Sequence, residues 1–470
     1  MSTDYFAHSA TETGYNHIKM GKVCEDSSGY YDDEKMHICV VADGHGSDNY
    51  PRTDRGSRYA VDVTIECIRE FVQLVDSDEM LIEKYQQSIL NQLSKSILNR
   101  WYAKVEEDYR VSPFTVEELE KVSNKYKDFY LSGKRVEKAY GSTLIAFAVT
   151  DQFSFGIQIG DGKCVMVDQE GKWLNPIPED DNCQLNVTTS ICDNNAIEEF
   201  RYCVLTQNPC AVFLGTDGVD DSYVNIDELY AFYRSILEIF SEYGNEVGKN
   251  EIKEYLPVLT KKGSGDDVSI AMIIDQLQNN LLRPVFLIQS EVFNKESELE
   301  NRKRQLLKRT EYLESVLNQI KSHLSDEQEN QEFYSELERV TAQISENRKS
   351  IVENKKEIAE LKEKLRTYTN KKIDTTITDT NSLPVKNACE EAVEVSSVEE
   401  HVIQINTECT PQTQSYRRKR QTASDMVETK VADMPANETD SDKRNCQDVE
   451  NHSEAVSAEE ISRTQQVCNC

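Results

Sequence analysis

Four short acidic turns carry the residues of this sequence that are best suited to chemistry. Each turn places a carboxylate beside glycine at one end of an apolar run: Asp43-Gly44-His45-Gly46, Gly160-Asp161-Gly162, Gly215-Thr216-Asp217-Gly218 and Gly265-Asp266-Asp267. A carboxylate at a strand end, with an imidazole two residues further on, suits metal-assisted acid–base chemistry. Any one of these turns, taken alone, is equally compatible with an ordinary turn that has no functional role. Because there are four such turns, each at an end of an apolar run, a functional site is favoured.

The elements around these turns can bring the carboxylates together. Residues 27–31 and 36–42 have the composition of two strands joined by a turn at 32–35. If these strands pair antiparallel, Glu25 and Asp26 return to the level of Asp43. In an antiparallel sheet the end of one strand lies beside the start of its neighbour, so Asp266 can join Asp43 and Asp217 at one rim.

A rim of carboxylates favours a divalent cation. The acidic groups would repel one another and raise one another's pKa unless cations neutralised them. Hard ions such as Mg²⁺ and Mn²⁺ take all-oxygen ligands of this kind. Zinc is disfavoured, because no spacing of cysteine and histidine suits it.

Composition separates a folded part from a long extension. Glycine and large apolar residues are frequent up to about residue 290 of the 470 and become sparse afterwards. The formal net charge of −31 argues against nucleic-acid binding, because a phosphate backbone would be repelled. We find no signal-peptide pattern and no transmembrane segment, and the 13 scattered cysteines indicate reduced thiols. These features predict a cytoplasmic protein.

Hydrophobic periodicity predicts a mixed α+β domain over residues 1–280. Helices are expected at 59–75, 80–111, 116–129, 227–243 and 252–259. Further strands are expected at 144–149, 153–159, 163–167, 204–205, 211–214 and 268–274, with a long polar loop at 176–200.

With these pieces in order, the chain resembles the metal-dependent protein phosphatases, the type 2C serine/threonine phosphatase (PPM) family. The matching motifs are Glu25-Asp26, Val41-Ala42-Asp43-Gly44-His45-Gly46, Gly141-Ser142-Thr143, Ile159-Gly160-Asp161-Gly162, Leu214-Gly215-Thr216-Asp217-Gly218 and Gly265-Asp266-Asp267-Val268-Ser269-Ile270. One such motif is weak evidence, but the ordered set spans roughly residues 5–275. The resemblance implies a four-layer αββα sandwich of two antiparallel sheets with a binuclear metal centre at one end.

The resemblance also implies roles for particular residues. Two Mg²⁺ or Mn²⁺ ions would share Asp43, with the Gly44 carbonyl on one ion and Asp217 and Asp266 on the other. Glu25 and Asp26 would act directly or through water, and Asp161 would match a residue that helps hold a third metal in some members. The ions would activate a water for attack on phosphorus. His45 would then protonate the leaving serine or threonine oxygen.

The chain departs from the family pattern at two places that concern substrate and metal. Many members carry an arginine that clamps the phosphate where this chain offers His17, which leaves His17, Lys19, Lys22 or Arg52 as candidate anchors. His17 is equally compatible with a surface histidine. The final motif commonly reads Asp-Asn and here reads Asp266-Asp267, which adds negative charge.

The extension is predicted to be a coiled coil at 290–370 followed by a disordered acidic tail at 371–470. Apolar residues recur at heptad spacing on both sides of a phase break near Ser325, so the helices either fold back as an antiparallel hairpin or continue as a dimerising rod. A solvated charged helix is the alternative. In the tail, Arg417-Arg418-Lys419-Arg420 is either a docking patch or solvated charge. The final Cys468-Asn469-Cys470 resembles a prenylation ending, although no C-a-a-X box is present.

Two functions are compatible with the sequence. The first is a metal-dependent phosphoserine/phosphothreonine protein phosphatase that assembles through its coiled coil, by self-association or with a partner helix. The second is a pseudophosphatase scaffold that binds phosphoproteins. The departures from the family pattern at His17 and Asp267 are the reason for considering it. No expected metal-ligand carboxylate is missing, so the enzyme is preferred.

Overall fold

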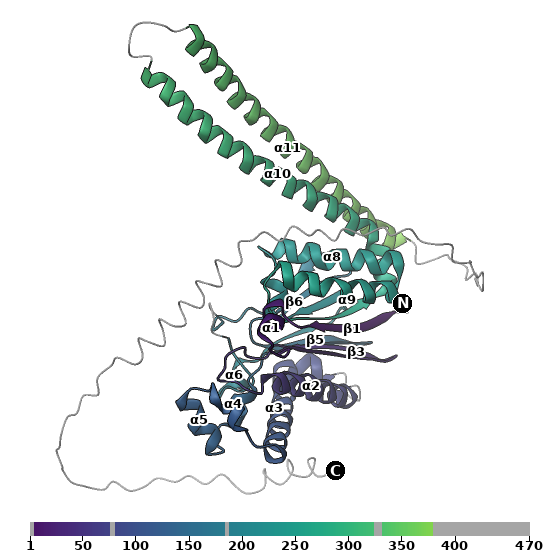
Figure 1. The fold of residues 1–470 in the computed structure, drawn as a ribbon. Helices are drawn as coiled ribbons and strands as arrows, with labels where there is room; N and C mark the ends of the chain where they lie inside the picture. The colour runs from purple at the N-terminus through teal and green to yellow at the C-terminus, as the bar shows by residue number, and fades with distance from the viewer. Residues whose placement is uncertain (1–3, 76–79, 184–187, 324–330, 379–470) are drawn as a thin grey trace, which may run out of the picture. The chain divides into compact units, whose positions relative to one another are not determined.

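The computed structural model of the chain describes residues 4–75, 80–183, 188–323 and 331–378. Two five-stranded antiparallel sheets form its middle layers (Figure 1). In sheet order, the first contains β2 (Ser27–Asp32), β3 (Met36–Ala42), β4 (Leu144–Thr150), β5 (Ser154–Ile159) and β8 (Arg201–Leu205). The second contains β1 (Tyr5–Glu12), β10 (Val268–Asp275), β9 (Ala211–Gly215), β6 (Lys163–Val167) and β7 (Trp173–Leu174).

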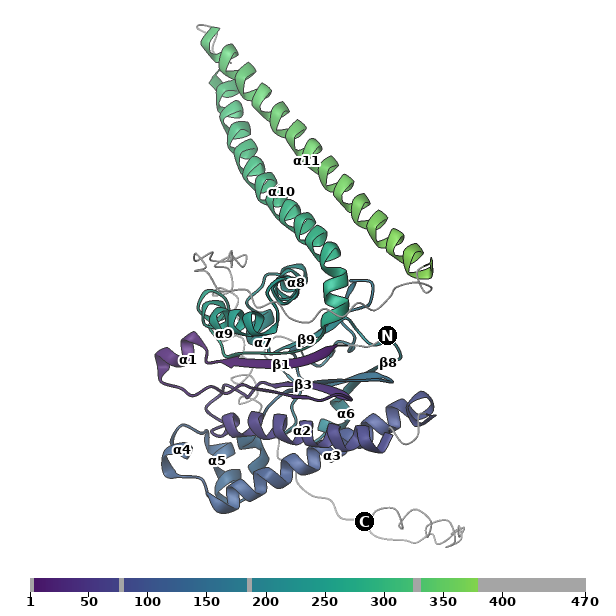
Figure 2. The ribbon, with the colours of Figure 1, turned by 90° about the vertical axis from the view of Figure 1, so that its right-hand side faces the viewer.

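Helices cover the outer face of each sheet (Figure 2). The first sheet packs against α2 (Thr53–Val75) and α3 (Met80–Val111). The second packs against α8 (Ile226–Tyr243), α9 (Asn245–Lys262) and the first turns of α10 (Gln276–His323). The shorter helices are α1 (Tyr15–Met20), α4 (Val116–Glu120), α5 (Asn124–Leu131), the 3₁₀ helix η1 (Val136–Tyr140), α6 (Ala196–Glu199) and α7 (Asp217–Asp220). The predicted four-layer αββα sandwich is confirmed.

The central strands are apolar throughout because both of their faces are covered. In β3, Val40 belongs to the cluster under α2 and α3, whereas Val41 belongs to the cluster between the two sheets. In β10, Met272 and Ile273 divide in the same way between the helix side and the sheet side. Side chains alternate along a strand, so a strand buried on both faces reads as a continuous apolar run. These runs made the strand ends predictable.

Some elements differ from the prediction. The segment at 116–129, expected as one helix, forms α4 and α5, and α9 is longer than the helix expected at 252–259. The first strand, β1, was not predicted. It is an edge strand that pairs with β10 alone, and its half-buried sequence includes His8, Ser9 and Thr11.

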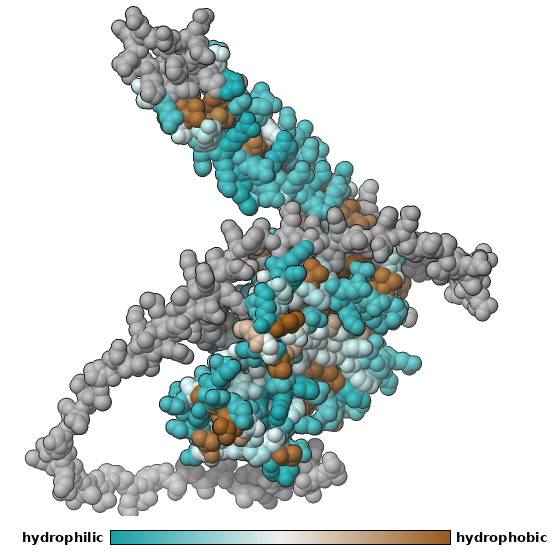
Figure 3. Space-filling view, in the orientation of Figure 1, coloured by the Kyte–Doolittle hydropathy of each residue, from teal (hydrophilic) through white to brown (hydrophobic). Residues whose placement is uncertain are grey.

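The extension consists of α10 and α11 (Gln331–Thr378), which pack against each other in antiparallel fashion. Lys295 pairs with Glu357, and Glu296 pairs with Lys362, so the ion pairs join the first half of α10 to the second half of α11. In Figure 3 the visible face of this helical pair is largely hydrophilic. Of the two predicted arrangements the structure has the hairpin, whereas a coiled coil and association with a second chain stay predictions.

The tail lies mostly outside the described residues. Helix α11 runs to Thr378, past the predicted start of disorder at 371. The basic run at 417–420 and the final Cys-Asn-Cys fall outside the described ranges. Within those ranges, no helix is both long and apolar enough to cross a membrane, and the cysteines are free thiols.

A buried arginine fastens the loop after Asp43-Gly44-His45-Gly46 to α4. The Arg52 side chain is 1% exposed. It donates from Nε and Nη2 to both carboxylate oxygens of Glu118, at 2.8 and 2.9 Å. Its Nη1 donates to the Ser112 carbonyl and the Tyr140 hydroxyl, and its guanidinium lies over the Phe114 ring. Arg52 is therefore fully engaged on the side of α4, which removes it from the candidate phosphate anchors.

Arg52→Met is expected to destabilise the protein by about 3 kcal/mol, because it leaves a partly buried carboxylate without its partner. A loss of this size lowers the melting temperature by roughly 6–12 °C in a domain of this length. The matched control is Arg55→Met. Arg55 pairs with Asp108 at 3.0 Å but is 34% exposed, so its loss should cost under about 1 kcal/mol. Equal melting temperatures for the two variants would contradict this interpretation.

Candidate metal and catalytic site

The first carboxylates of the site lie at one end of the β2–β3 hairpin. The register of this pair places Asp26, just before β2, opposite Asp43, just after β3. Beyond the strands, the Gly44 N–H donates to the Glu25 carbonyl at 3.1 Å. A Cβ on Gly44 would lie only 2.4 Å from that oxygen, so this close approach requires glycine. The hairpin therefore returns Glu25 and Asp26 to the level of Asp43, as the sequence predicts.

The second sheet contributes carboxylates at the same end. Asp217 follows β9 and Asp266 precedes β10, and these two strands are antiparallel neighbours. Thr216 joins the sheets, because its hydroxyl donates to Asp26 Oδ2 at 2.7 Å and also accepts from the Ser269 N–H at 3.0 Å. Strand ends that are far apart in sequence thus meet at one rim.

The carboxylates at this rim perturb one another. Burial raises the pKa of Asp43 well above its usual value, and the charges of Asp217 and Asp26, with a hydrogen bond to Asp217, raise it further. The pKa of Asp26 is also raised well above its usual value. Burial is the main cause and the charges of Asp267 and Asp217 add to it, against the hydrogen bond from Thr216. The cluster is electrostatically unfavourable without a cation.

The donor set fits a hard divalent cation. The groups at the rim are carboxylates and backbone carbonyls, which are the ligands that Mg²⁺ and Mn²⁺ prefer. Glu25 has a buried oxygen, Oε2, that makes no hydrogen bond within the described part of the chain. Burial also raises the pKa of Glu25, although Lys22 and His17 oppose the shift. A divalent ion would satisfy this oxygen and relieve the repulsion between Asp43 and its neighbours.

The two departures from the family pattern are partners of each other. His17 Nδ1 lies 2.9 Å from Asp267 Oδ1, and the backbone N–H groups of Gly14 and Glu25 each donate to the Asp267 carboxylate at 2.6 Å. Although burial opposes it, these contacts hold the pKa of Asp267 below its usual value. His17, Glu25 and Asp267 also offer ligand atoms within 4.8 Å of one another. The Asp267 charge is thus already compensated by its neighbours.

The candidate phosphate anchors differ in their surroundings. His17 is 7% exposed, and its Nε2 lies 3.7 Å from both Glu25 and Asp266. Lys19 lies over the Tyr15 ring. Lys22 Nζ donates to the Gly46 carbonyl at 3.1 Å, and its side chain is 32% exposed. Lys22 Nζ also lies 3.9 Å from Glu25 Oε1, so Lys22 is a partly exposed cation beside the acidic rim, while His17 as the anchor stays a prediction.

His45 lies beside the rim in a half-buried position. Its Nε2 is 2.8 Å from Ser190 Oγ, and its ring meets the Tyr50 ring edge-on at 4.8 Å between centroids. Burial lowers the pKa of His45 to about 4, with Lys138 adding to the effect and Asp193 opposing it. Without substrate the imidazole is therefore neutral at neutral pH.

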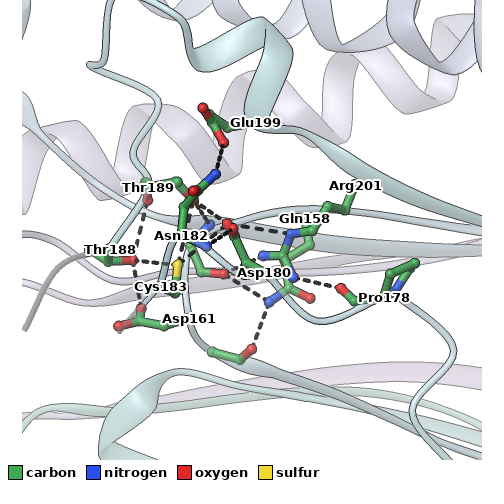
Figure 4. A network of polar contacts seen from close by, with 12 residues as sticks. Gln158, Asp161, Pro178, Asp180, Asn182, Cys183, Thr188, Thr189, Glu199 and Arg201 are labelled. Atoms are coloured by element: carbon green, nitrogen blue, oxygen red, sulfur yellow. Dashed lines mark hydrogen bonds and ion pairs between the residues drawn. The ribbon is translucent and has the colours of Figure 1, made fainter. Parts of the chain in front are cut away.

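Asp161 is held by Thr188, which lies in the polar loop at 176–200. Thr188 Oγ1 donates to Asp161 Oδ1 at 3.0 Å (Figure 4). The negative charge of Asp161 also contributes to the raised pKa of Asp43. Asp161 therefore lies near the principal carboxylates, at the edge of the same cluster.

Sequence reasoning missed several residues of this site. Nothing in the spacing connects Ser190 with His45, which is 145 positions away. Asp267 was noted only as added charge, and its pairing with His17 is a long-range contact. Asp220, whose pKa burial raises well above its usual value, was not singled out from the sequence.

Comparisons with known proteins identify a family for the chain. The family model described as Protein phosphatase 2C matches residues 13–257. No curated protein matches the chain in sequence. Among solved structures, serine/threonine phosphatase Stp1 from Staphylococcus aureus is 15% identical, with a TM-score of 0.37 and coverage of 58% of this chain and 96% of that chain.

Two further solved structures are similar at the same distance. PppA, a regulatory component of T6SS in Pseudomonas aeruginosa, is 16% identical, with a TM-score of 0.37 over 58% of this chain and 98% of that chain. RsbX in complex with magnesium is 14% identical, with a TM-score of 0.31 over 57% and 94%. These are distant likenesses. The family model covers more than half of the chain, and the chain therefore belongs to the protein phosphatase 2C family.

Proposed function

We propose that this protein is a phosphatase that uses divalent metal ions to hydrolyse phosphoserine and phosphothreonine in proteins. The observation that carries the proposal is the convergence of Asp26, Asp43 and Asp217 from two sheets, with raised pKa values at Asp26 and Asp43. Purely structural buried carboxylates are normally paired with cations or saturated with hydrogen bonds. Here repulsion is retained, which is expected where function requires it.

The proposed ligands follow the family pattern. Two ions, Mg²⁺ or Mn²⁺, would be held by Asp43, the Gly44 carbonyl, Asp217 and Asp266, with Glu25 and Asp26 acting directly or through water. Asp161 would help hold a third ion. When bound, the ions would supply an activated water and neutralise charge on the phosphoryl oxygens.

The side chains around the ions have separate tasks. His45 would give a proton to the leaving serine or threonine oxygen, because the negative phosphoryl group favours the protonated imidazole. Lys22, whose partly exposed ammonium lies beside Glu25, is suited to contact the phosphate. The contacts of His17 favour a role in holding Asp267. We therefore propose Lys22 as the first choice of phosphate anchor and His17 as the second.

The reason for considering a pseudophosphatase scaffold is weakened. It depended on the departures at His17 and Asp267, which could have disabled metal or phosphate binding. Asp267 Oδ1 lies 2.9 Å from His17 Nδ1, and the Asp267 carboxylate accepts from the N–H groups of Gly14 and Glu25, so Asp267 has partners of its own within the protein. This pairing supports the enzyme.

The test is metal dependence. With millimolar Mn²⁺ the full-length protein should hydrolyse a phosphoserine peptide, and a chelator should abolish the reaction. Mn²⁺ at a hundredfold excess over its Kd should stabilise the fold by about 2.7 kcal/mol. That corresponds to a rise in melting temperature of roughly 5–11 °C. A protein that neither hydrolyses the peptide nor is stabilised by Mn²⁺ would be the scaffold.

The composition of the sequence supports two further proposals, about where the enzyme works and what it binds. We infer a cytoplasmic phosphatase whose substrates are phosphoproteins and whose partners are not nucleic acids. The helices at 290–370 would then serve self-association or the binding of a partner helix.

A further inference from the structure

The His45 ring is fixed from several sides. Its backbone N–H donates to the Gly141 carbonyl at 3.1 Å, and a Cβ on Gly141 would lie 2.3 Å from His45 Cδ2. The Tyr50 ring lies on another side, and Ser190 Oγ contacts Nε2 at 2.8 Å. Of these contacts, the one from Ser190 is the hydrogen bond to a ring nitrogen. This hydrogen bond therefore determines which ring nitrogen of His45 is held by the protein.

The surroundings of Ser190 favour one direction for that hydrogen bond. Ser190 is 2% exposed. Its hydroxyl has two acceptors besides His45, the Ser142 carbonyl at 3.0 Å and Cys192 Sγ at 3.2 Å, and a carbonyl oxygen can only accept. The Cys192 N–H donates to Ser190 Oγ at 3.3 Å. When the hydroxyl proton is directed at Ser142 or at Cys192, Ser190 offers His45 a lone pair, so His45 Nε2 carries the hydrogen and Nδ1 is the remaining nitrogen.

Ser190 is the last residue of a short strap, residues 188–190, that is anchored independently. Thr189 Oγ1 donates to Asp180 Oδ2 at 2.8 Å and accepts from the Gly160 N–H at 3.0 Å. Arg201 reaches the carbonyl oxygens of Gly160 and Pro178 (Figure 4). The strap thereby joins the turn that carries Asp161 to the His45 ring.

We propose that Ser190 is a positioning residue that holds His45 by Nε2 and so leaves Nδ1 to deliver the proton to the leaving oxygen. This inference rests on the proposed phosphatase function. Ser190 does not touch the substrate. It acts by fixing the tautomer and the orientation of the imidazole, as the hydrogen-bond partners of functional histidines do.

The test compares leaving groups in Ser190→Ala. Phenyl phosphate releases an oxygen about as basic as a tyrosine side chain, with a pKa of about 10, and needs protonation, whereas p-nitrophenyl phosphate releases a much weaker base. Loss of an orienting partner costs roughly ten- to hundredfold. We expect this loss in kcat/KM for phenyl phosphate, and a much smaller loss for p-nitrophenyl phosphate. The matched control is Ser154→Ala, which removes a buried hydroxyl bonded to Asn208 at the opposite end of β5.

A second measurement does not depend on activity. In the metal-free full-length protein at neutral pH, nitrogen NMR of the imidazole should show His45 protonated at Nε2, and Ser190→Ala should shift that resonance. Equal losses on both substrates, no loss on either, or a ring protonated at Nδ1 would overturn the role of Ser190. Failure of the wild-type protein to hydrolyse either substrate would instead overturn the proposed function.

Discussion

Asp43→Asn is expected to lower the Mn²⁺-dependent hydrolysis of p-nitrophenyl phosphate by at least about 10²–10³-fold, the cost of removing one preorganised electrostatic group. The same substitution should raise the melting temperature of the metal-free protein. Burial and the charges of Asp217 and Asp26 make the Asp43 carboxylate unfavourable, and asparagine removes that charge. Opposite effects on activity and on stability distinguish a functional carboxylate from a structural one.

The raised pKa values also predict how the stability of the metal-free protein changes with pH. The folded-state pKa values of Asp43 and Asp26 are raised, while in the unfolded chain Asp ionises near about 3.9. Above that pH the folded state binds more protons than the unfolded state, so the free energy of unfolding falls as pH rises. In chelator, the wild-type protein should lose stability from pH 4 upward through the raised pKa values. Asp43→Asn should show a flatter curve.

The matched control is Asp151→Asn, at the exposed turn between β4 and β5, at the opposite end of these strands from Asp161. It should leave hydrolysis and the pH curve unchanged. If Asp43→Asn retained activity within a few-fold of the wild type, or destabilised the metal-free protein, the proposed role of Asp43 would be wrong.

His45→Gln is expected to lower kcat/KM for phenyl phosphate by roughly 10²–10⁴-fold, which is the usual contribution of a general acid. The loss on p-nitrophenyl phosphate should be much smaller, because its leaving group needs no proton. Glutamine retains a hydrogen-bonding group of similar reach, so the variant mainly removes proton transfer.

Another histidine supplies the control for this prediction. His8 lies in the edge strand β1, beside the Tyr30 ring, and His8→Gln should leave both rates unchanged. A similar loss of His45→Gln activity on the two substrates would show that His45 binds or supports the site without donating a proton.

The sequence was sufficient to predict the parts of this fold that depend on local pattern. Strands β3, β9 and β10 are covered on both faces, so their apolar runs and the acidic turns at their ends stand out. The gathering of Asp26, Asp43 and Asp217 could be inferred because antiparallel pairing restricts which strand ends meet. Strand β1 escaped notice because an edge strand tolerates polar residues such as His8.

The remaining features depend on contacts that no local pattern reveals. His17 and Asp267 are in contact although they lie near opposite ends of the domain in sequence. Taken alone, each residue looks like a departure from the family motif. The strap at 188–190 lies within the polar loop at 176–200, which has no periodicity, so the Ser190 hydroxyl could not be connected with His45. In the extension, heptad spacing predicted long helices but left the hairpin and the rod equally open.

The central claim is that acidic residues from both sheets hold two divalent ions at one rim. The most direct measurement is anomalous diffraction from crystals of the full-length protein grown with Mn²⁺. We predict two manganese peaks that both contact the Asp43 carboxylate, with Asp217 and Asp266 beside one of them. Crystals with saturating Mn²⁺ but no peak at Asp43, or with manganese bound only elsewhere on the surface, would contradict the account.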